Sequence, residues 1–222
     1  MKLGILGLLV VWLHSAAFAA DLPVRFFNSA DKTKPLVFYI SGDGGWNNFS
    51  TSLVQSLNQQ GFPVVGLDAK AYFWDRKTPD QTAQDVATLL QQYSAQWEKN
   101  GVVFIGYSFG ADVMPFVQSR LPKPILQSLK TTLLLSPSER TDFEVHLLDA
   151  FTSSSHALPV MPEINQLTKP VTLFFGSDEK TDYAKAITSK TVHVITLDGG
   201  HHYNNDGATL AKQLINAVER SK

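Results

Sequence analysis

The 222-residue chain contains no cysteine, so it has neither a disulfide framework nor a thiolate metal site. Its N-terminal apolar run, Leu3–Leu13, is too short to span a bilayer, and no second hydrophobic span follows. The 19 basic residues nearly balance the 20 acidic ones, without a basic stripe. This balance argues against nucleic acid as the main partner and gives no polybasic membrane patch.

The first residues have the three parts of a secretory signal. Lys2 is a short positive region, Leu3–Leu13 is the apolar region, and Ala17–Ala19 is a cleavage site of the A-x-A type. We therefore expect residues 1–19 to be a cleaved signal peptide and residues 20–222 to form one domain. An exported chain without disulfides is typical of a bacterial periplasm, which is the localisation we predict.

Apolar runs of strand length alternate with longer amphipathic segments along the rest of the chain. The predicted strands are Val24–Phe27, Leu36–Ile40, Val64–Leu67, Val102–Gly106, Thr131–Leu135, Val171–Phe175 and Val192–Leu197. The predicted helices are Asn48–Gln60, Pro79–Trp97, Phe109–Arg120, Asp182–Ser189 and Asp206–Arg220. Several strands are almost continuously apolar, as expected when helices cover both faces of a parallel sheet. The pattern predicts the α/β class, with a mostly parallel twisted sheet and helices on both faces.

The strand Val102–Gly106 leads into the pentapeptide Gly106–Gly110, which reads G-Y-S-F-G. A G-x-S-x-G sequence between a strand and a helix is the nucleophile elbow of the α/β-hydrolase fold. Its glycines are needed because the turn brings strand and helix backbone too close for a Cβ atom. The pattern predicts an α/β-hydrolase with Ser108 as the nucleophile.

A serine nucleophile needs a base, and the fold supplies it as a histidine late in the chain. The loop after Val192–Leu197 contains His201 and His202. We favour His202 as the base, because it is the third residue after Gly199 and precedes an aromatic residue, which is the commoner spacing in this fold. His201, which directly follows a glycine, is the alternative. Adjacent side chains diverge and no H-E-x-x-H spacing is present, so we predict no metal site.

The acid that orients the histidine should follow the strand Val171–Phe175. Three carboxylates lie there, and counting three residues from Gly176 gives Glu179. We rank Glu179 first, Asp182 second and Asp178 third. Asp182 can instead cap the next helix.

The oxyanion formed during attack needs two N–H donors. One is expected from Phe109, the residue after the nucleophile, and the other from Asp43, or Gly44, in the glycine-rich loop Ser41–Trp46. That loop lacks the G-K-[ST] and G-x-G-x-x-G patterns of nucleotide sites, and we predict no cofactor. Asp112, one helical turn after Ser108, either lines the floor of a pocket or favours the helix N-terminus.

Five segments together resemble the bacterial virulence protein VirJ family, which includes the C-terminal domain of AcvB. They are Ser41–Trp46, Tyr72–Trp74 with the following Arg76–Pro79, Gly106–Asp112, Leu135–Pro137 and Gly199–His202. The resemblance implies an α/β-hydrolase fold, location in the periplasm of a Gram-negative bacterium, and links to virulence and type IV secretion. It also implies hydrolysis of aminoacylated phosphatidylglycerol, notably the lysyl ester, with Ser108 as nucleophile and the base in the His201–His202 pair.

The sequence therefore predicts a periplasmic serine ester hydrolase that acts on a lipid or small-molecule ester. Its expected partners are the substrate, a membrane surface contacted transiently, and secretion-system proteins, but not nucleic acid. One alternative is a hydrolase of small soluble esters or thioesters. Another is a catalytically silent interaction protein of a type IV secretion system. The irregular stretch Ser136–Lys169 leaves open whether a lid covers the site.

Overall fold

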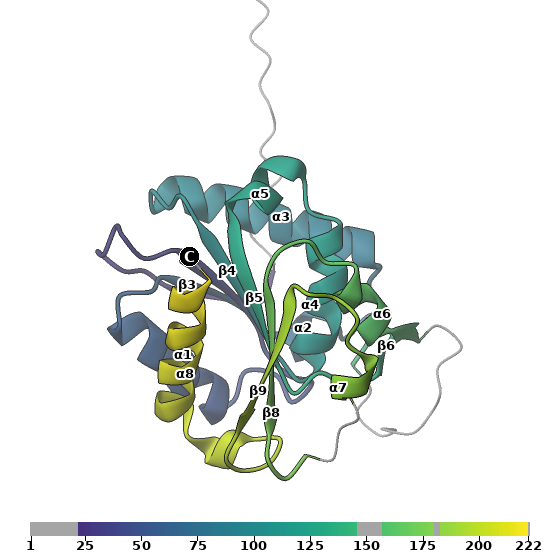
Figure 1. The fold of residues 1–222 in the computed structure, drawn as a ribbon. Helices are drawn as coiled ribbons and strands as arrows, with labels where there is room; N and C mark the ends of the chain where they lie inside the picture. The colour runs from purple at the N-terminus through teal and green to yellow at the C-terminus, as the bar shows by residue number, and fades with distance from the viewer. Residues whose placement is uncertain (1–21, 146–156, 180–182, 222) are drawn as a thin grey trace, which may run out of the picture.

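The computed structural model describes residues 22–145, 157–179 and 183–221 (Figure 1). The expected signal peptide, residues 1–19, lies outside this part of the chain, and so does Asp182. Across the described ranges, none of the helices combines the length and the apolar character that crossing a membrane requires.

Seven strands form one sheet in the order β1-β3-β2-β4-β5-β8-β9. Their bounds are β1 Val24–Phe27, β2 Leu36–Ile40, β3 Val64–Leu67, β4 Val102–Tyr107, β5 Leu129–Leu135, β8 Val171–Gly176 and β9 Val192–Leu197. The strand β1 runs antiparallel to β3, and the other pairs in this sheet are parallel. A separate antiparallel pair joins β6, Arg140–Thr141, to β7, Leu158–Pro159. The predicted α/β class with a mostly parallel sheet is confirmed.

Helices cover both faces of the sheet (Figure 1). One face carries α1, Asn48–Gln59, and α8, Gly207–Arg220, which pack against each other. The other face carries α3, Pro79–Gln96, α4, Phe109–Ser119, and α6, Val160–Asn165. The remaining short helices are α2 Ala69–Tyr72, α5 Lys123–Ser128, α7 Tyr183–Ala186 and the 3₁₀ turn η1 Tyr203–Asn205. Asp206 caps α8, because its carboxylate accepts the Thr209 N–H at 2.9 Å.

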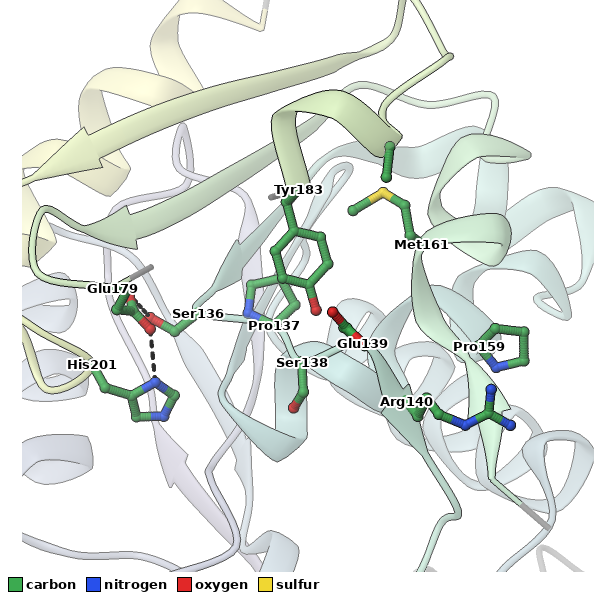
Figure 2. Close-up of a pocket in the computed structure, with 11 residues that line it drawn as sticks. Ser136, Pro137, Ser138, Glu139, Arg140, Pro159, Met161, Glu179, Tyr183 and His201 are labelled. Atoms are coloured by element: carbon green, nitrogen blue, oxygen red, sulfur yellow. Dashed lines mark hydrogen bonds and ion pairs between the residues drawn. The ribbon is translucent and has the colours of Figure 1, made fainter. Parts of the chain in front are cut away.

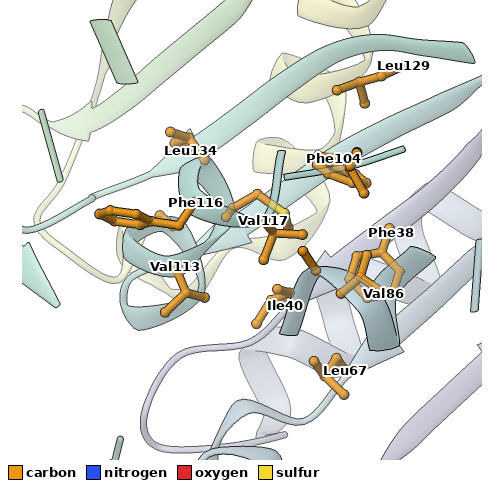
Figure 3. Close-up of a cluster of buried hydrophobic side chains, with 14 of the residues drawn as sticks. Phe38, Ile40, Leu67, Val86, Phe104, Val113, Phe116, Val117, Leu129 and Leu134 are labelled. Atoms are coloured by element: carbon orange, nitrogen blue, oxygen red, sulfur yellow. The ribbon is translucent and has the colours of Figure 1, made fainter. Parts of the chain in front are cut away.

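The helix α4 packs on the centre of the sheet. Its Val113 and Val117 are fully buried beside side chains of β2 and β4, such as Phe38 and Phe104 (Figure 3). Burying a side chain of this size contributes about 1.5–3 kcal/mol, so the contact holds the start of α4 firmly against the end of β4. The residue between them, Ser108, is thereby fixed in place.

The parallel register brings the carboxyl ends of the central strands to one edge. Gly106 of β4 lies beside Ile40 of β2 and Leu134 of β5, and Gly176 of β8 lies beside Leu197 of β9. The loops that follow these strands therefore converge on a single crevice. Crevices at the carboxyl edge are where open α/β sheets bind their ligands.

Candidate active site

Ser108 occupies a sharp turn between β4 and α4. Its backbone has φ 51° and ψ −118°, a conformation that residues with a side chain rarely adopt. The Ser108 N–H donates to the carbonyl oxygen of Leu135 at 2.8 Å, which fixes the turn to the neighbouring strand. Strain of this kind persists only where the surrounding structure enforces it, and here it lifts the hydroxyl above the sheet.

The glycines on either side of Ser108 are sterically required. A Cβ atom on Gly106 would lie 2.4 Å from the carbonyl oxygen of Gly110. A Cβ atom on Gly110 would lie 2.2 Å from the carbonyl oxygen of Ile40. Both distances are far below van der Waals contact, so the pentapeptide meets the backbone constraint that the sequence predicted for it.

The imidazole of His201 lies between Ser108 and Glu179. Its Nε2 atom is 2.9 Å from Ser108 Oγ, and its Nδ1 atom is 2.9 Å from Glu179 Oε1. A hydroxyl, an imidazole and a carboxylate in this line allow the imidazole to take the hydroxyl proton while the carboxylate stabilises the resulting charge. The three groups come from loops after β4, β9 and β8, in the chain order serine, acid, histidine.

Glu179 is held by two further hydrogen bonds at its second carboxylate oxygen. Oε2 accepts the Ser136 hydroxyl at 2.7 Å and the Gly176 N–H at 2.6 Å. Ser136 Oγ in turn lies 2.7 Å from the buried Tyr203 hydroxyl. Because one oxygen is occupied in this way, the other faces His201 in a fixed direction (Figure 2).

The structure corrects the preference for His202. Its Nδ1 atom lies 2.6 Å from the Tyr107 hydroxyl, and its ring stands at 83° to that of His201. Consecutive side chains leave the loop in different directions, and a count of residues from Gly199 does not determine which one faces Ser108. His201 is the imidazole at the nucleophile.

Of the three carboxylates considered, the structure brings the first-ranked Glu179 to the histidine. The N–H of Asp178 instead donates to the carbonyl oxygen of Gly199, and its carboxylate accepts the Ser177 hydroxyl. Asp182 lies outside the described residues.

The two predicted oxyanion donors lie in segments that reach the turn at Ser108. Phe109 is the first residue of α4, where an N–H has no partner within the helix. The loop after β2 also reaches the turn, since a Cβ atom on Gly42 would lie 3.5 Å from Ser108 Cβ. The next residue, Asp43, is exposed, and its carboxylate accepts a hydrogen bond from the Gly44 N–H. The roles of the Phe109 and Asp43 N–H groups stay a prediction.

Asp112 is buried and ties α4 to the loop after β5. Its two carboxylate oxygens accept the N–H and the hydroxyl of Ser138 at 2.5 and 2.6 Å. The pKa of Asp112 is raised to about 7, mainly because burial disfavours the charged carboxylate. The two hydrogen bonds from Ser138 oppose this rise, and the charge of Asp43 adds to it. Asp112 lies in the first turn of α4, and the choice between its two expected roles stays a prediction.

A cavity of about 640 Å³ opens beside the His201–Glu179 pair (Figure 2). It is lined by Ser136, Pro137, Ser138, Glu139, Arg140, Pro159, Met161, Glu179, Tyr183, Ala186 and His201. Among the residues the structure describes, no three or more histidine and acidic side chains gather as a metal site would require.

A family model described as "Bacterial virulence protein (VirJ)" matches residues 34–222. No curated protein matches the chain. Among solved structures, the esterase domain of a Rhodothermus marinus protein is 14% identical with a TM-score of 0.60, and the match covers 89% of this chain and 97% of that one. Est1E from Butyrivibrio proteoclasticus is 14% identical with a TM-score of 0.63, covering 89% and 92% of the two chains. The Pyrococcus furiosus esterase Pf2001 is 13% identical with a TM-score of 0.63, covering 90% of each. At this identity the likeness shows the α/β-hydrolase fold alone.

Proposed function

The chain belongs to the VirJ family of bacterial virulence proteins, and on that premise we propose that it is a serine ester hydrolase. The observation that carries the proposal is the line of two 2.9 Å contacts from Ser108 through His201 to Glu179. Such a line is the arrangement that activates a serine hydroxyl for acyl transfer.

In the proposed reaction Ser108 Oγ attacks the ester carbonyl carbon while His201 Nε2 accepts the hydroxyl proton. Glu179 holds the imidazole and stabilises its positive charge. The N–H groups of Phe109 and Asp43 bind the carbonyl oxygen as it becomes negative. The ester C–O bond then breaks, the alcohol leaves with the proton from His201, and the acyl group stays on Ser108. Water, deprotonated by His201, then attacks the acyl carbon. The bond to Ser108 Oγ breaks, Oγ takes the proton from His201, and the acid is released.

The finer proposal concerns the substrate and its location. We propose that the ester is the aminoacyl ester of lysyl-phosphatidylglycerol, and that the protein acts in the periplasm after removal of residues 1–19. Family membership supports the substrate, since the resemblance to AcvB-like members implies it. Transient contact with a membrane surface and with secretion-system proteins belongs to the same proposal.

The substrate is tested with vesicles that contain lysyl-phosphatidylglycerol. We expect the purified protein, residues 20–222, to release free lysine, and Ser108→Ala to release none above the vesicle blank. Turnover of short p-nitrophenyl esters without lysine release would refute the lipid substrate and favour soluble esters.

The proposed chemistry has its own test. A fluorophosphonate probe forms a covalent bond only with an activated serine, so it should label the wild type and leave Ser108→Ala unlabelled. A wild-type protein that is folded but unlabelled would refute hydrolysis and favour a silent interaction protein.

A further inference from the structure

The cavity beside the triad has one wall that the proposed reaction does not use. His201 and Glu179 form one end, and the segment Ser136–Arg140 continues the lining away from the nucleophile. The short helix α7 contributes Tyr183 from above in Figure 2. At about 640 Å³ the cavity can hold a portion of substrate well beyond the scissile ester.

Tyr183 places an unpaired hydroxyl at this cavity. The residue is 8% exposed, and its hydroxyl has no hydrogen-bond partner among the residues that the structure describes. Its ring stacks on Phe175 with centroids 5.1 Å apart, which fixes the direction of the side chain. Figure 2 shows the hydroxyl directed toward Ser138 and Glu139, across the cavity. A buried hydroxyl without a partner is unfavourable, and a bound group that forms a hydrogen bond with it would remove that cost.

The charge around that hydroxyl decides what kind of group it accepts. Burial raises the pKa of Tyr183, and the nearby carboxylates of Asp112, Glu139 and Glu179 raise it further, so the phenol stays neutral. As a neutral phenol, Tyr183 has oxygen lone pairs that can accept a hydrogen bond from a bound group. Arg140 lies at the other end of the cavity, where its guanidinium donates a hydrogen bond to the carbonyl oxygen of Ala157.

We propose that this cavity is a subsite for the part of the ester that carries hydrogen-bond donors and no negative charge, with Tyr183 as a specificity-determining residue. A hydroxyl and an ammonium group share this chemistry, because each donates hydrogen bonds to an oxygen lone pair and to a carboxylate. A carboxylate or phosphate in the same place would meet Glu139 and Glu179 and be repelled. The inference rests on the proposed hydrolase function, since it concerns selection among esters.

The test uses p-nitrophenyl esters whose acyl chain ends in methyl, hydroxyl, ammonium or carboxylate, and a second series with the same four groups on the alcohol. In the series that reaches the cavity, we expect kcat/KM to be roughly tenfold higher for hydroxyl and ammonium than for methyl, and lowest for carboxylate. Tyr183→Phe should remove that preference mainly through KM, while p-nitrophenyl acetate, too small to reach the cavity, keeps its rate.

Two further variants keep the test decisive. Tyr93→Phe removes a hydroxyl from α3, distant in sequence from every group of the site, and should match the wild type on all esters. Glu139→Gln changes an exposed residue, so it tests the subsite even if Tyr183→Phe fails to fold. It should raise kcat/KM for the carboxylate ester and lower the preference for ammonium over hydroxyl.

The outcomes separate this inference from the proposed function. A wild type that reacts with the fluorophosphonate but hydrolyses all four groups equally in both series would overturn the subsite alone. So would a Tyr183→Phe variant that slows every ester, acetate included, by the same factor. Absence of both labelling and hydrolysis would instead refute the hydrolase proposal beneath it.

Discussion

His201 and His202 are consecutive residues, yet their imidazole rings belong to two different hydrogen-bond networks. The ring of His201 joins Ser108 to Glu179, and through Glu179 it continues to Ser136 and inward. The ring of His202 contacts the Tyr107 hydroxyl on β4. The first network connects a half-buried nucleophile to buried groups, whereas the second holds the loop against the sheet. A histidine therefore gains its role from the groups that its ring nitrogens meet.

The two networks also differ in what supports them. Glu179 accepts a backbone N–H at its own strand end, so its position depends on the main chain as well as on side chains. The ring of His202 depends on one side-chain hydroxyl, and no carboxylate among the described residues forms a hydrogen bond with it. Substitutions in the first network should therefore change chemistry, and substitutions in the second should mainly change how firmly the loop is held.

The largest contrast is expected between His201→Asn and His202→Asn. Losing the base of a serine triad lowers kcat by about 10⁴-fold or more, because the hydroxyl is no longer deprotonated during attack. We expect that loss for His201→Asn and less than a tenfold change for His202→Asn, with kcat measured on p-nitrophenyl acetate. The reverse ranking would show that the loop rearranges and that His202 is the base.

The sequence predicted the strands and the nucleophile well, for a physical reason. The central strands are buried on both faces and read as continuous apolar runs, and β1, β2, β3 and β9 begin and end at the predicted residues. The turn at Ser108 was also predictable, because glycine is the residue type that the crowded backbone permits at Gly106 and Gly110.

Other features depend on contacts that no local pattern encodes. The short helices α2, α5 and α6 span four to six residues, too few for a helical period to emerge. The direction of His201 depends on Ser108 and Glu179, which are distant in sequence. Ser136 could have been placed at the site from the sequence, since it directly follows a strand that ends at the carboxyl edge. No sequence pattern pointed to Tyr183.

The next contrast lies between two adjacent carboxylates. Glu179→Gln keeps the shape of the side chain but can donate to His201 Nδ1, which would leave the proton on Nε2, facing Ser108. The comparable change in a serine protease triad lowers kcat by about 10⁴-fold, and we expect a loss of about 10²- to 10⁴-fold here.

Asp178→Asn is the matched control, since its carboxylate lies beside Ser177 rather than His201. It should keep wild-type kcat on p-nitrophenyl acetate. Equal activity of Glu179→Gln and the wild type would remove Glu179 from the mechanism and direct attention to Asp182.

The smallest effect is expected when the hydrogen bond between Tyr107 and His202 is removed. Tyr107→Phe leaves His202 Nδ1 without its 2.6 Å partner but keeps the ring that packs against Phe49. The free energy of unfolding in urea should fall by about 0.5–1.5 kcal/mol, the usual contribution of one hydrogen bond, while kcat changes less than tenfold.

A double-mutant cycle identifies the cause of that loss. If the Tyr107 hydroxyl acts through His202, Tyr107→Phe should destabilise the His202→Asn variant less than it destabilises the wild type. Strict additivity would mean that the hydroxyl acts elsewhere, for instance on the carbonyl oxygen of His201 at 3.3 Å. In that case the two networks would share a member, and a change at Tyr107 should also disturb the alignment of His201 with Ser108.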